Sequence, residues 1–201
     1  MELEDVAAIH LEAIEVIINH ILYIRGVYPL QIFKKRRVYN TPVFIVAFPA
    51  LNCYLANVLK TVKQMLVNQV QELKLEVIIY GDEGDHMESY VLEMLPVVSE
   101  DQNQDQYLLE YEEQLRSALY KLAERVKKLP KLSKNSKFKV QIHTTQTAFT
   151  HLSHDAQYQE FPWLQTDGNS QLGEESQRFA LLPLATVKKV GLKMQAQIFT
   201  C

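Results

Sequence analysis

Few side chains of this sequence have the types and spacing that catalysis needs. Only two cysteines occur, Cys53 and Cys201. Cys53 has no basic partner within reach along the sequence to make it a thiolate nucleophile, so we expect a small core or boundary residue. His86-Met87-Glu88 matches the first half of a zinc deaminase signature, but the Pro-Cys-x-x-Cys half is missing. Because phosphate-binding glycine loops and Gly-x-Ser-x-Gly or His-Glu-x-x-His motifs are absent too, we expect a protein that is not an enzyme.

Three histidines, His143, His151 and His154, are close enough in the sequence to gather around a metal ion. Asp155 is the only acid beside them and no cysteine is near, so we expect surface histidines, no metal site and no cofactor. The stretch Gly81–Gly84 has the Gly-x-x-Gly spacing of an RNA-binding module. Two acids between its glycines would repel phosphate, which favours a plain turn.

Charge is distributed unevenly along the chain. The 21 Lys and Arg against 24 Asp and Glu give a net charge of −3, which provides no global attraction to nucleic acid. Lys34 to Arg37 form one basic block, and nine basic residues against the single acid Glu124 fill Arg116 to Lys139. Solvent-exposed faces, patches that bind a partner, or a nuclear localisation signal would each explain these basic blocks. Direct binding to nucleic acid is an alternative, but aromatic residues do not alternate with the basic ones, so we expect no sequence-specific binding.

Length and composition indicate one compact domain. With 201 residues, 47% of them hydrophobic, the chain can bury a core without disulfides or metals. Its two distant cysteines favour a reducing compartment, and its acidic start is unlike a targeting peptide. The most apolar run, Ala13 to Ile24, is shorter than the roughly 20 residues that cross a bilayer. We expect a soluble protein without a membrane partner.

Apolar periodicity predicts three helices and several strands. Val6 to Ile24 is apolar on both faces, as in a helix surrounded by protein. Helices from Pro49 to Leu66 and from Leu108 to Leu129 each have one apolar face. Leu73 to Tyr80 and His86 to Leu95 flank a glycine-bearing turn and predict a hairpin. Shorter strands are predicted at Ile32–Phe33, Arg37–Tyr39, Val43–Phe48 and Phe138–Ile142.

The chain from His143 to Cys201 lacks such a pattern. Its periodicity is weak and prolines and glycines interrupt it, so we expect a mostly irregular segment that docks on the rest through short apolar pieces. The lone tryptophan occurs here, in Phe161-Pro162-Trp163. Pro162 holds this tripeptide extended, which suits Trp163 either as a plug in the core or as the wall of a binding pocket.

Four short segments carry a family resemblance: ILYIRGVYP at 21–29, IFKKRRVYNTPV at 32–43, PALNCY at 49–54 and FPW at 161–163. Together they resemble the HORMA-domain accessory subunits of DNA polymerase zeta, the mitotic-arrest-deficient-like 2 family of translesion synthesis, over about residues 6–199. The resemblance implies an α+β fold with three helices packed on a mainly antiparallel sheet. It also implies a single HORMA domain over residues 1–201, with a core at about 6–143 and a C-terminal safety belt at about 144–201.

The resemblance implies a non-catalytic adaptor in DNA damage tolerance. In the family the safety belt closes over a proline-containing peptide of the polymerase zeta catalytic subunit, which is added as a strand. Tyr54 and Trp163 match the aromatic walls around that peptide. Such a protein would be nuclear, with a cytoplasmic pool also allowed. The alternative is a mitotic checkpoint or cell-cycle adaptor that clamps peptides of cell-division regulators with the same belt.

The resemblance also implies two further contact surfaces. Leu181 and Gln195 match positions that contact the C-terminal domain of a second translesion polymerase, the deoxycytidyl-transferring scaffold. The family has an aromatic residue at the position of Gln197, so this contact would be altered here. Arg116, together with Lys35, matches the surface by which HORMA domains pair as homodimers or heterodimers.

Overall fold

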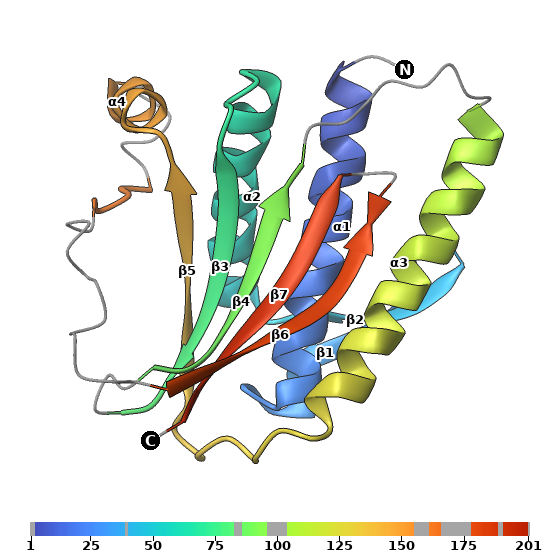
Figure 1. Cartoon of the computed structure of the whole chain (residues 1–201), viewed down its shortest axis with the longest axis vertical. Coiled ribbons are helices and arrows are strands. Elements are labelled where there is room, and N and C mark those ends of the chain that lie inside the picture. Colours follow the sequence, from blue (N-terminus) through green and yellow to red (C-terminus); the bar gives the residue numbers. More distant parts are fainter. Residues whose placement is uncertain are drawn as a thin grey trace.

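Helices pack against a twisted antiparallel sheet in this protein (Figure 1). The computed structural model describes residues 3–38, 40–82, 86–95, 104–154, 161–165, 178–188 and 191–200. Its helices are α1 (Leu3–Arg25), α2 (Pro49–Val67), α3 (Gln104–Val126) and the short α4 (Gln146–His154), with a 3-10 turn at Leu30–Ile32. Helices α1 and α2 cover one face of the sheet, and α3 runs beside the edge that the C-terminal strands form (Figure 1).

The described strands form two antiparallel sheets. The smaller sheet pairs β1 (Phe33–Val38) with β2 (Thr41–Val46). The larger sheet has the order β5-β3-β4-β7-β6, and each neighbouring pair is antiparallel. Its strands are β3 (Leu73–Tyr80), β4 (His86–Met94), β5 (Lys137–Thr144), β6 (Arg178–Val187) and β7 (Leu192–Thr200). Three long helices on a mainly antiparallel sheet confirm the predicted α+β class.

Helix α1 is the centre of the core. Its residues Ile14, Ile17 and Ile21 are completely buried, as the apolar pattern on both faces predicts. Burying an aliphatic side chain of this size contributes about 1.5–3 kcal/mol. By length and composition α1 is sufficient to cross a membrane, whereas its shorter apolar run predicted that it is not. In the folded protein, however, 61% of the apolar 18-residue window of this helix is buried. Such burial is typical of a core helix.

A buried ion pair joins the end of α1 to β4. The Nε of Arg25 donates to Oε2 of Glu88 at 2.8 Å, and its Nη2 contacts the other carboxylate oxygen. The same Nη2 donates to the carbonyl oxygen of Pro130 at 2.7 Å, and the Tyr90 hydroxyl donates to Glu88 Oε2 at 2.7 Å. Charge-assisted bonds in a buried site are strong and directional. They therefore hold α1, β4 and the chain after α3 in one arrangement.

The C-terminal residues form a regular hairpin where the sequence predicted a mostly irregular segment. Strands β6 and β7 pair with each other, and β7 pairs with β4. On β7, Leu192, Met194 and Ala196 are buried, which is the ordinary alternation of a strand with one face on the core. The sequence pattern did not predict β6, because Pro183 interrupts it and the register shifts between Pro183 and Ala185.

Two further expectations are wrong. Residues 33–38 form one continuous strand rather than two short pieces, because the basic block Lys34 to Arg37 is exposed on a two-stranded sheet, where no apolar alternation is required. Cys53 is exposed and is not a core or boundary residue. The buried face of α2 is formed by other residues, among them Leu51, Leu55 and Val58.

Candidate functional site

Strand β5 is an edge strand of the larger sheet in the described part of the chain. Among the described strands β5 pairs only with β3. In an antiparallel pair the backbone groups of alternate residues turn away from the partner strand. Val140 is one of these residues, since its N–H donates to the Tyr54 hydroxyl at 3.0 Å. By the same alternation, the backbone groups of Ile142 and Thr144 face the open edge, where an added strand would pair.

Aromatic rings line this edge. Tyr54 of α2 packs edge-on against Phe138 of β5 and against Phe161, with ring centroids 5.8 and 5.9 Å apart. Phe161 in turn packs edge-on against Trp163 at 5.4 Å. We call Tyr54, Phe138, Phe161 and Trp163 the aromatic wall. Tyr54 and Trp163, which the sequence placed in one binding site, therefore belong to one cluster that Phe161 connects.

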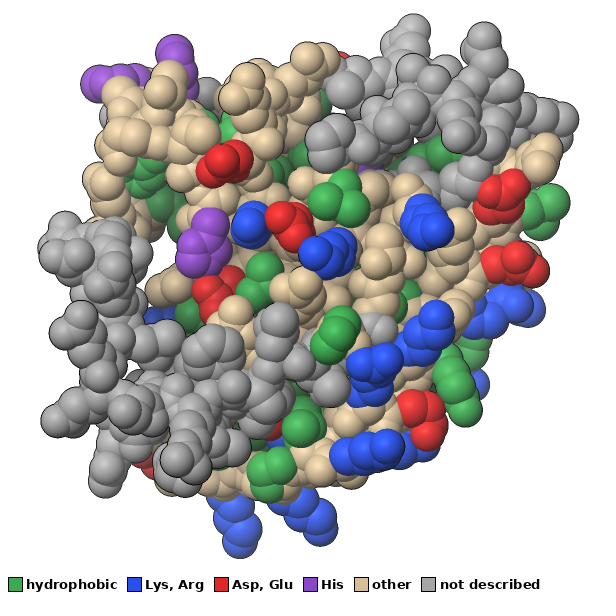
Figure 2. All heavy atoms as spheres, viewed as in Figure 1, with side chains coloured by type: hydrophobic (Ala, Val, Ile, Leu, Met, Phe, Trp, Pro, Cys, Tyr) green, Lys and Arg blue, Asp and Glu red, His purple; other side chains and the backbone are tan. Residues whose placement is uncertain are grey.

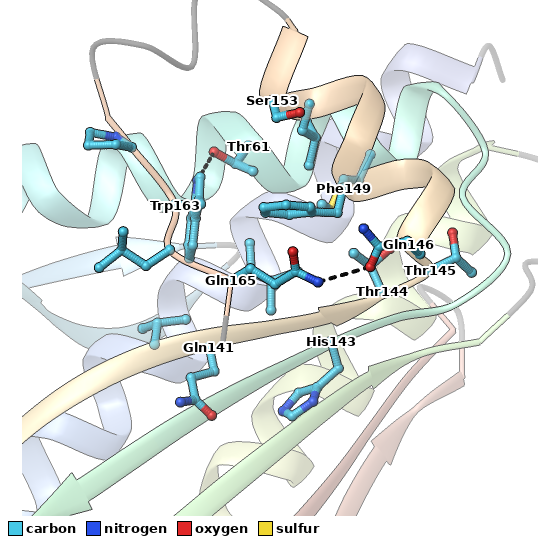
Figure 3. Close-up of a pocket in the computed structure, with 16 residues that line it drawn as sticks. Thr61, Gln141, His143, Thr144, Thr145, Gln146, Phe149, Ser153, Trp163 and Gln165 are labelled. Atoms are coloured by element: carbon cyan, nitrogen blue, oxygen red, sulfur yellow. Dashed lines mark hydrogen bonds between the residues drawn. The ribbon is translucent and has the colours of Figure 1, made fainter. Parts of the chain in front are cut away.

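Segment 161–165 lies over the β5 edge and is bonded to two helices (Figure 3). The Nε1–H of Trp163 donates to Oγ1 of Thr61, a buried residue of α2, at 3.1 Å. The side-chain amide of Gln165 donates to Oε1 of Gln146, at the start of α4, at 2.9 Å. Two bonds to separate helices fix the direction in which the Trp163 ring faces the sheet.

A cavity of about 530 Å³ opens between β5, α4 and this segment. Its apolar walls include the side chains of Met65, Phe149, Leu152 and Trp163. Figure 3 shows the rings of Phe149 and Trp163 on one side of β5, whereas Gln141 and His143 point away from them. The cavity is of the size that takes small ligands or parts of larger ones, and it continues directly from the aromatic wall.

The residues predicted to contact a second polymerase lie at the other end of the sheet. Leu181 of β6 is directly opposite Gln197 of β7 in the register, and Gln195 is opposite Pro183. Gln195 and Gln197 are both partly exposed, and their spacing of two puts them on the same face of β7. Strands β3, β4 and β7 separate β6 from β5. The two predicted sites are therefore distinct surfaces.

The two residues predicted to pair HORMA domains are both on the surface. Arg116 is an exposed residue of α3, and Lys35 is an exposed residue of β1. Figure 2 shows further basic side chains on the molecular surface, interspersed with acidic ones. Both residues are accessible to a partner, and their role in pairing stays a prediction.

The histidines singled out in the sequence lie on β5 and α4. Within the described ranges there is no group of three or more His, Cys, Asp or Glu residues that could hold a metal ion. The Nε2 of His143 lies 2.8 Å from Oε2 of Glu76, while His151 and His154 lie in the last turn of α4. The side chain of His86 lies outside the described part of the chain.

Sequence reasoning missed three groups of this site: Thr61, Phe149 and the backbone N–H of Val140. Phe149 lies on α4, in the stretch predicted to be irregular, although its spacing to Leu152 is that of one helix face. Thr61 meets Trp163 across 102 residues of chain. No local pattern could have indicated that contact, since it depends on how the chain folds back.

Known proteins are similar in sequence to this chain over nearly its full length. The HORMA domain family matches residues 8–181. DNA polymerase zeta subunit 2 of Drosophila melanogaster is 46% identical over 200 residues, which cover 98% of this chain and 99% of that protein. The mitotic spindle assembly checkpoint protein MAD2B of Rattus norvegicus is 32% identical over 193 residues, covering 96% of this chain and 90% of that protein.

Solved structures share the fold. The crystal structure of a mitotic checkpoint complex contains a chain with a TM-score of 0.74 at 17% identity, covering 97% of this chain and 98% of that one. C. elegans HTP-2 bound to a HIM-3 closure motif has a TM-score of 0.67 at 10% identity, covering 99% and 91%. The overall fold is thus that of a HORMA domain. The chain belongs to the HORMA-domain family that includes DNA polymerase zeta subunit 2 and MAD2B.

Proposed function

We propose that this protein is a non-catalytic accessory subunit of translesion DNA polymerase zeta that clamps a proline-containing peptide of the catalytic subunit. The observation that carries the proposal is the open edge of β5, bordered by the aromatic wall and crossed by segment 161–165. The similarity to a polymerase zeta subunit over nearly the full chain supports the choice of partner.

The chemistry of the edge suits such a peptide. An added strand gains backbone hydrogen bonds from β5, and pockets beside the edge select its side chains. Prolines stack well on aromatic faces, and Tyr54 and Trp163 offer two of these at the edge. In this proposal residues 1–201 are one HORMA domain with its core at about 6–143, and residues from about 144 onward act as the belt that slows peptide release.

The adaptor role requires a second partner. We assign the C-terminal domain of the deoxycytidyl-transferring scaffold polymerase to the hairpin of β6 and β7, around Leu181, Gln195 and Gln197. Because this hairpin lies at the end of the sheet opposite β5, both partners fit on one molecule. A bridge between two translesion polymerases acts at damaged DNA, so we place the protein in the nucleus.

A second candidate function is a mitotic checkpoint or cell-cycle adaptor. It is favoured by the similarity to a protein named for the spindle assembly checkpoint and by the likeness to a chain of a mitotic checkpoint complex. The same β5 edge would then hold a peptide of a cell-division regulator. The identity of the bound peptide distinguishes the two functions.

The test is a calorimetric titration of the full chain with a proline-containing peptide of the polymerase zeta catalytic subunit from the same organism. We expect saturable binding that Trp163→Ala weakens by more than about 1 kcal/mol, the usual threshold for an interface anchor. Gln195→Ala is the control, since it lies at the other end of the sheet and should leave the affinity unchanged. A folded protein that does not bind this peptide contradicts the polymerase role and leaves the cell-division peptides to be tested.

A further inference from the structure

We propose that the cavity between α4 and β5 receives one large, uncharged apolar side chain of the strand that pairs with β5, and that Phe149 selects this side chain. The inference rests on the proposed function and adds a specificity site to it. The site adjoins the aromatic wall, with which it shares Trp163, and uses a residue of α4 that the sequence did not single out.

Hydrogen bonding limits where a strand can pair with β5. The N–H of Val140 already donates to the Tyr54 hydroxyl, so the free part of the ladder lies toward the end of the strand. The next residues in that direction whose backbone groups face the open edge are Ile142 and Thr144, and both line the cavity. A strand paired there has side chains on alternate sides, so one of them faces Phe149 and Trp163.

The lining of the cavity matches an uncharged occupant. Among the described residues that line it there is no Asp, Glu, Lys or Arg, and His143 is the only titratable side chain. Figure 3 shows His143 pointing away from the rings of Phe149 and Trp163. A charged side chain placed between these rings would lose its hydration without gaining a partner, whereas an apolar one gains from burial. A volume of about 530 Å³ holds a large side chain together with adjoining backbone.

The position of α4, which carries Phe149, is fixed by hydrogen bonds, so Phe149 can select the bound side chain by its size. Its backbone N–H donates to the carbonyl oxygen of Thr145 at 3.1 Å, which begins α4 directly after β5. The amide pair of Gln146 and Gln165 ties the same end of α4 to segment 161–165. These bonds hold α4 and segment 161–165 next to each other. The gap between the rings of Phe149 and Trp163 then limits the size of the side chain that enters.

The experiment is a double-mutant cycle by calorimetry. The probe is the catalytic-subunit peptide used above, in which each Leu, Ile, Val, Met or Phe is changed to Ala in turn. We expect one position at which this change weakens binding to the wild-type protein at least tenfold but weakens binding to Phe149→Ala less than threefold. Phe149→Trp, which puts a larger ring into the cavity and narrows the gap to Trp163, should weaken binding of the unmodified peptide at least tenfold. Thr147→Ala, an exposed change on the same helix, should behave as wild type.

Each outcome decides the matter. Equal losses at every peptide position in wild type and Phe149→Ala, together with unchanged affinity of Phe149→Trp, overturn the specificity site and leave the clamp standing. Absence of binding to the wild-type protein overturns both, and Tyr54→Ala, a change in the aromatic wall outside the cavity, reports on the clamp alone. Circular dichroism and thermal melting of the two Phe149 variants separate a lost contact from a lost fold.

Discussion

The hydroxyl of Tyr54 accepts a hydrogen bond from the backbone N–H of Val140 at 3.0 Å, so a side chain of α2 occupies a donor on the edge of the sheet. Unpaired backbone N–H groups allow an edge strand to pair with other chains. The bond to Tyr54 removes one such N–H group, that of Val140, and so limits this pairing. Burial raises the pKa of Tyr54, more than the bond from Val140 lowers it. The phenol therefore stays protonated at neutral pH and can donate its own hydrogen to a strand that passes the edge.

Tyr54→Phe separates the roles of the ring and the hydroxyl. It keeps the contacts with Phe138 and Phe161 but leaves the Val140 N–H without its partner. We expect the free energy of unfolding to fall by about 0.5–1.5 kcal/mol, the net value of one hydrogen bond. Urea denaturation followed by circular dichroism measures this loss.

Peptide affinity should respond differently to the two changes at Tyr54. Tyr54→Phe should bind the catalytic-subunit peptide within threefold of wild type, because the ring remains and Val140 becomes free to pair. Tyr54→Ala removes the ring from the aromatic wall and should weaken binding by more than about 1 kcal/mol. If Tyr54→Phe loses as much affinity as Tyr54→Ala, the hydroxyl and not the ring holds the peptide.

The elements that the sequence predicts well are those with a strong internal pattern. The two-sided apolar pattern of α1, the apolar stripe of α2 and the hairpin of β3 and β4 all occur where predicted. The third helix is offset, since α3 covers Gln104–Val126 while the apolar stripe runs from Leu108 to Leu129. Helix ends depend on capping and local hydrogen bonds more than on the stripe, so they are the less predictable part.

The site is predictable only in part. The Phe161-Pro162-Trp163 tripeptide draws attention by composition, and the family resemblance pairs Trp163 with Tyr54. The partners of these residues depend on tertiary folding: Trp163 meets Thr61, and Tyr54 meets a backbone group of Val140. A backbone N–H has no sequence signature, and a threonine in a helix is ordinary, so no pattern could indicate either contact.

Glu88→Gln tests the buried ion pair with Arg25. The side chains of Arg25 and Glu88 are 6% and 3% exposed, so removing the carboxylate charge leaves a buried guanidinium without its counter-ion. We expect a loss of about 3–5 kcal/mol in the free energy of unfolding, measured by urea denaturation. Glu93→Gln is the matched control on the same strand, because Glu93 pairs with Lys74 at 3.2 Å near the surface. A surface pair of this kind contributes at most about 1 kcal/mol. Similar losses in the free energy of unfolding in both variants would contradict the larger contribution assigned to the buried pair of Arg25 and Glu88.

Acidification should destabilise the protein through two histidines of α1. Burial lowers the pKa of both His10 and His20, only partly offset by their hydrogen bonds to the carbonyl oxygens of Val6 and Leu119. The unfolded chain then binds protons more readily than the folded one, so stability is complete above the ordinary value of 6.5 and falls as the pH drops below it. Each histidine contributes at most about 1.4 kcal/mol per pH unit.

Denaturation midpoints between pH 7.5 and 5.5 measure this dependence. His20→Gln can still donate to the carbonyl oxygen of Leu119 but does not titrate, so its stability should depend less steeply on pH than that of wild type. His151→Gln is the control, because His151 is exposed at the end of α4. A wild-type stability that is flat over this range would contradict the burial of both imidazoles as neutral groups.

Arg116→Ala tests the predicted pairing of HORMA domains. Arg116 is exposed on α3, so its removal should change the free energy of unfolding by no more than about 0.5 kcal/mol. If Arg116 belongs to the pairing surface, the variant should remain monomeric in sedimentation velocity at concentrations where wild type self-associates. Lys121→Ala removes another exposed positive charge from the same helix and should keep wild-type association.

Equal loss of association in both variants would mean that net positive charge on α3, and not a specific contact of Arg116, drives pairing. Unchanged association of Arg116→Ala would place the pairing surface elsewhere, and because the peptide edge is on β5, peptide affinity should be the same in all three proteins.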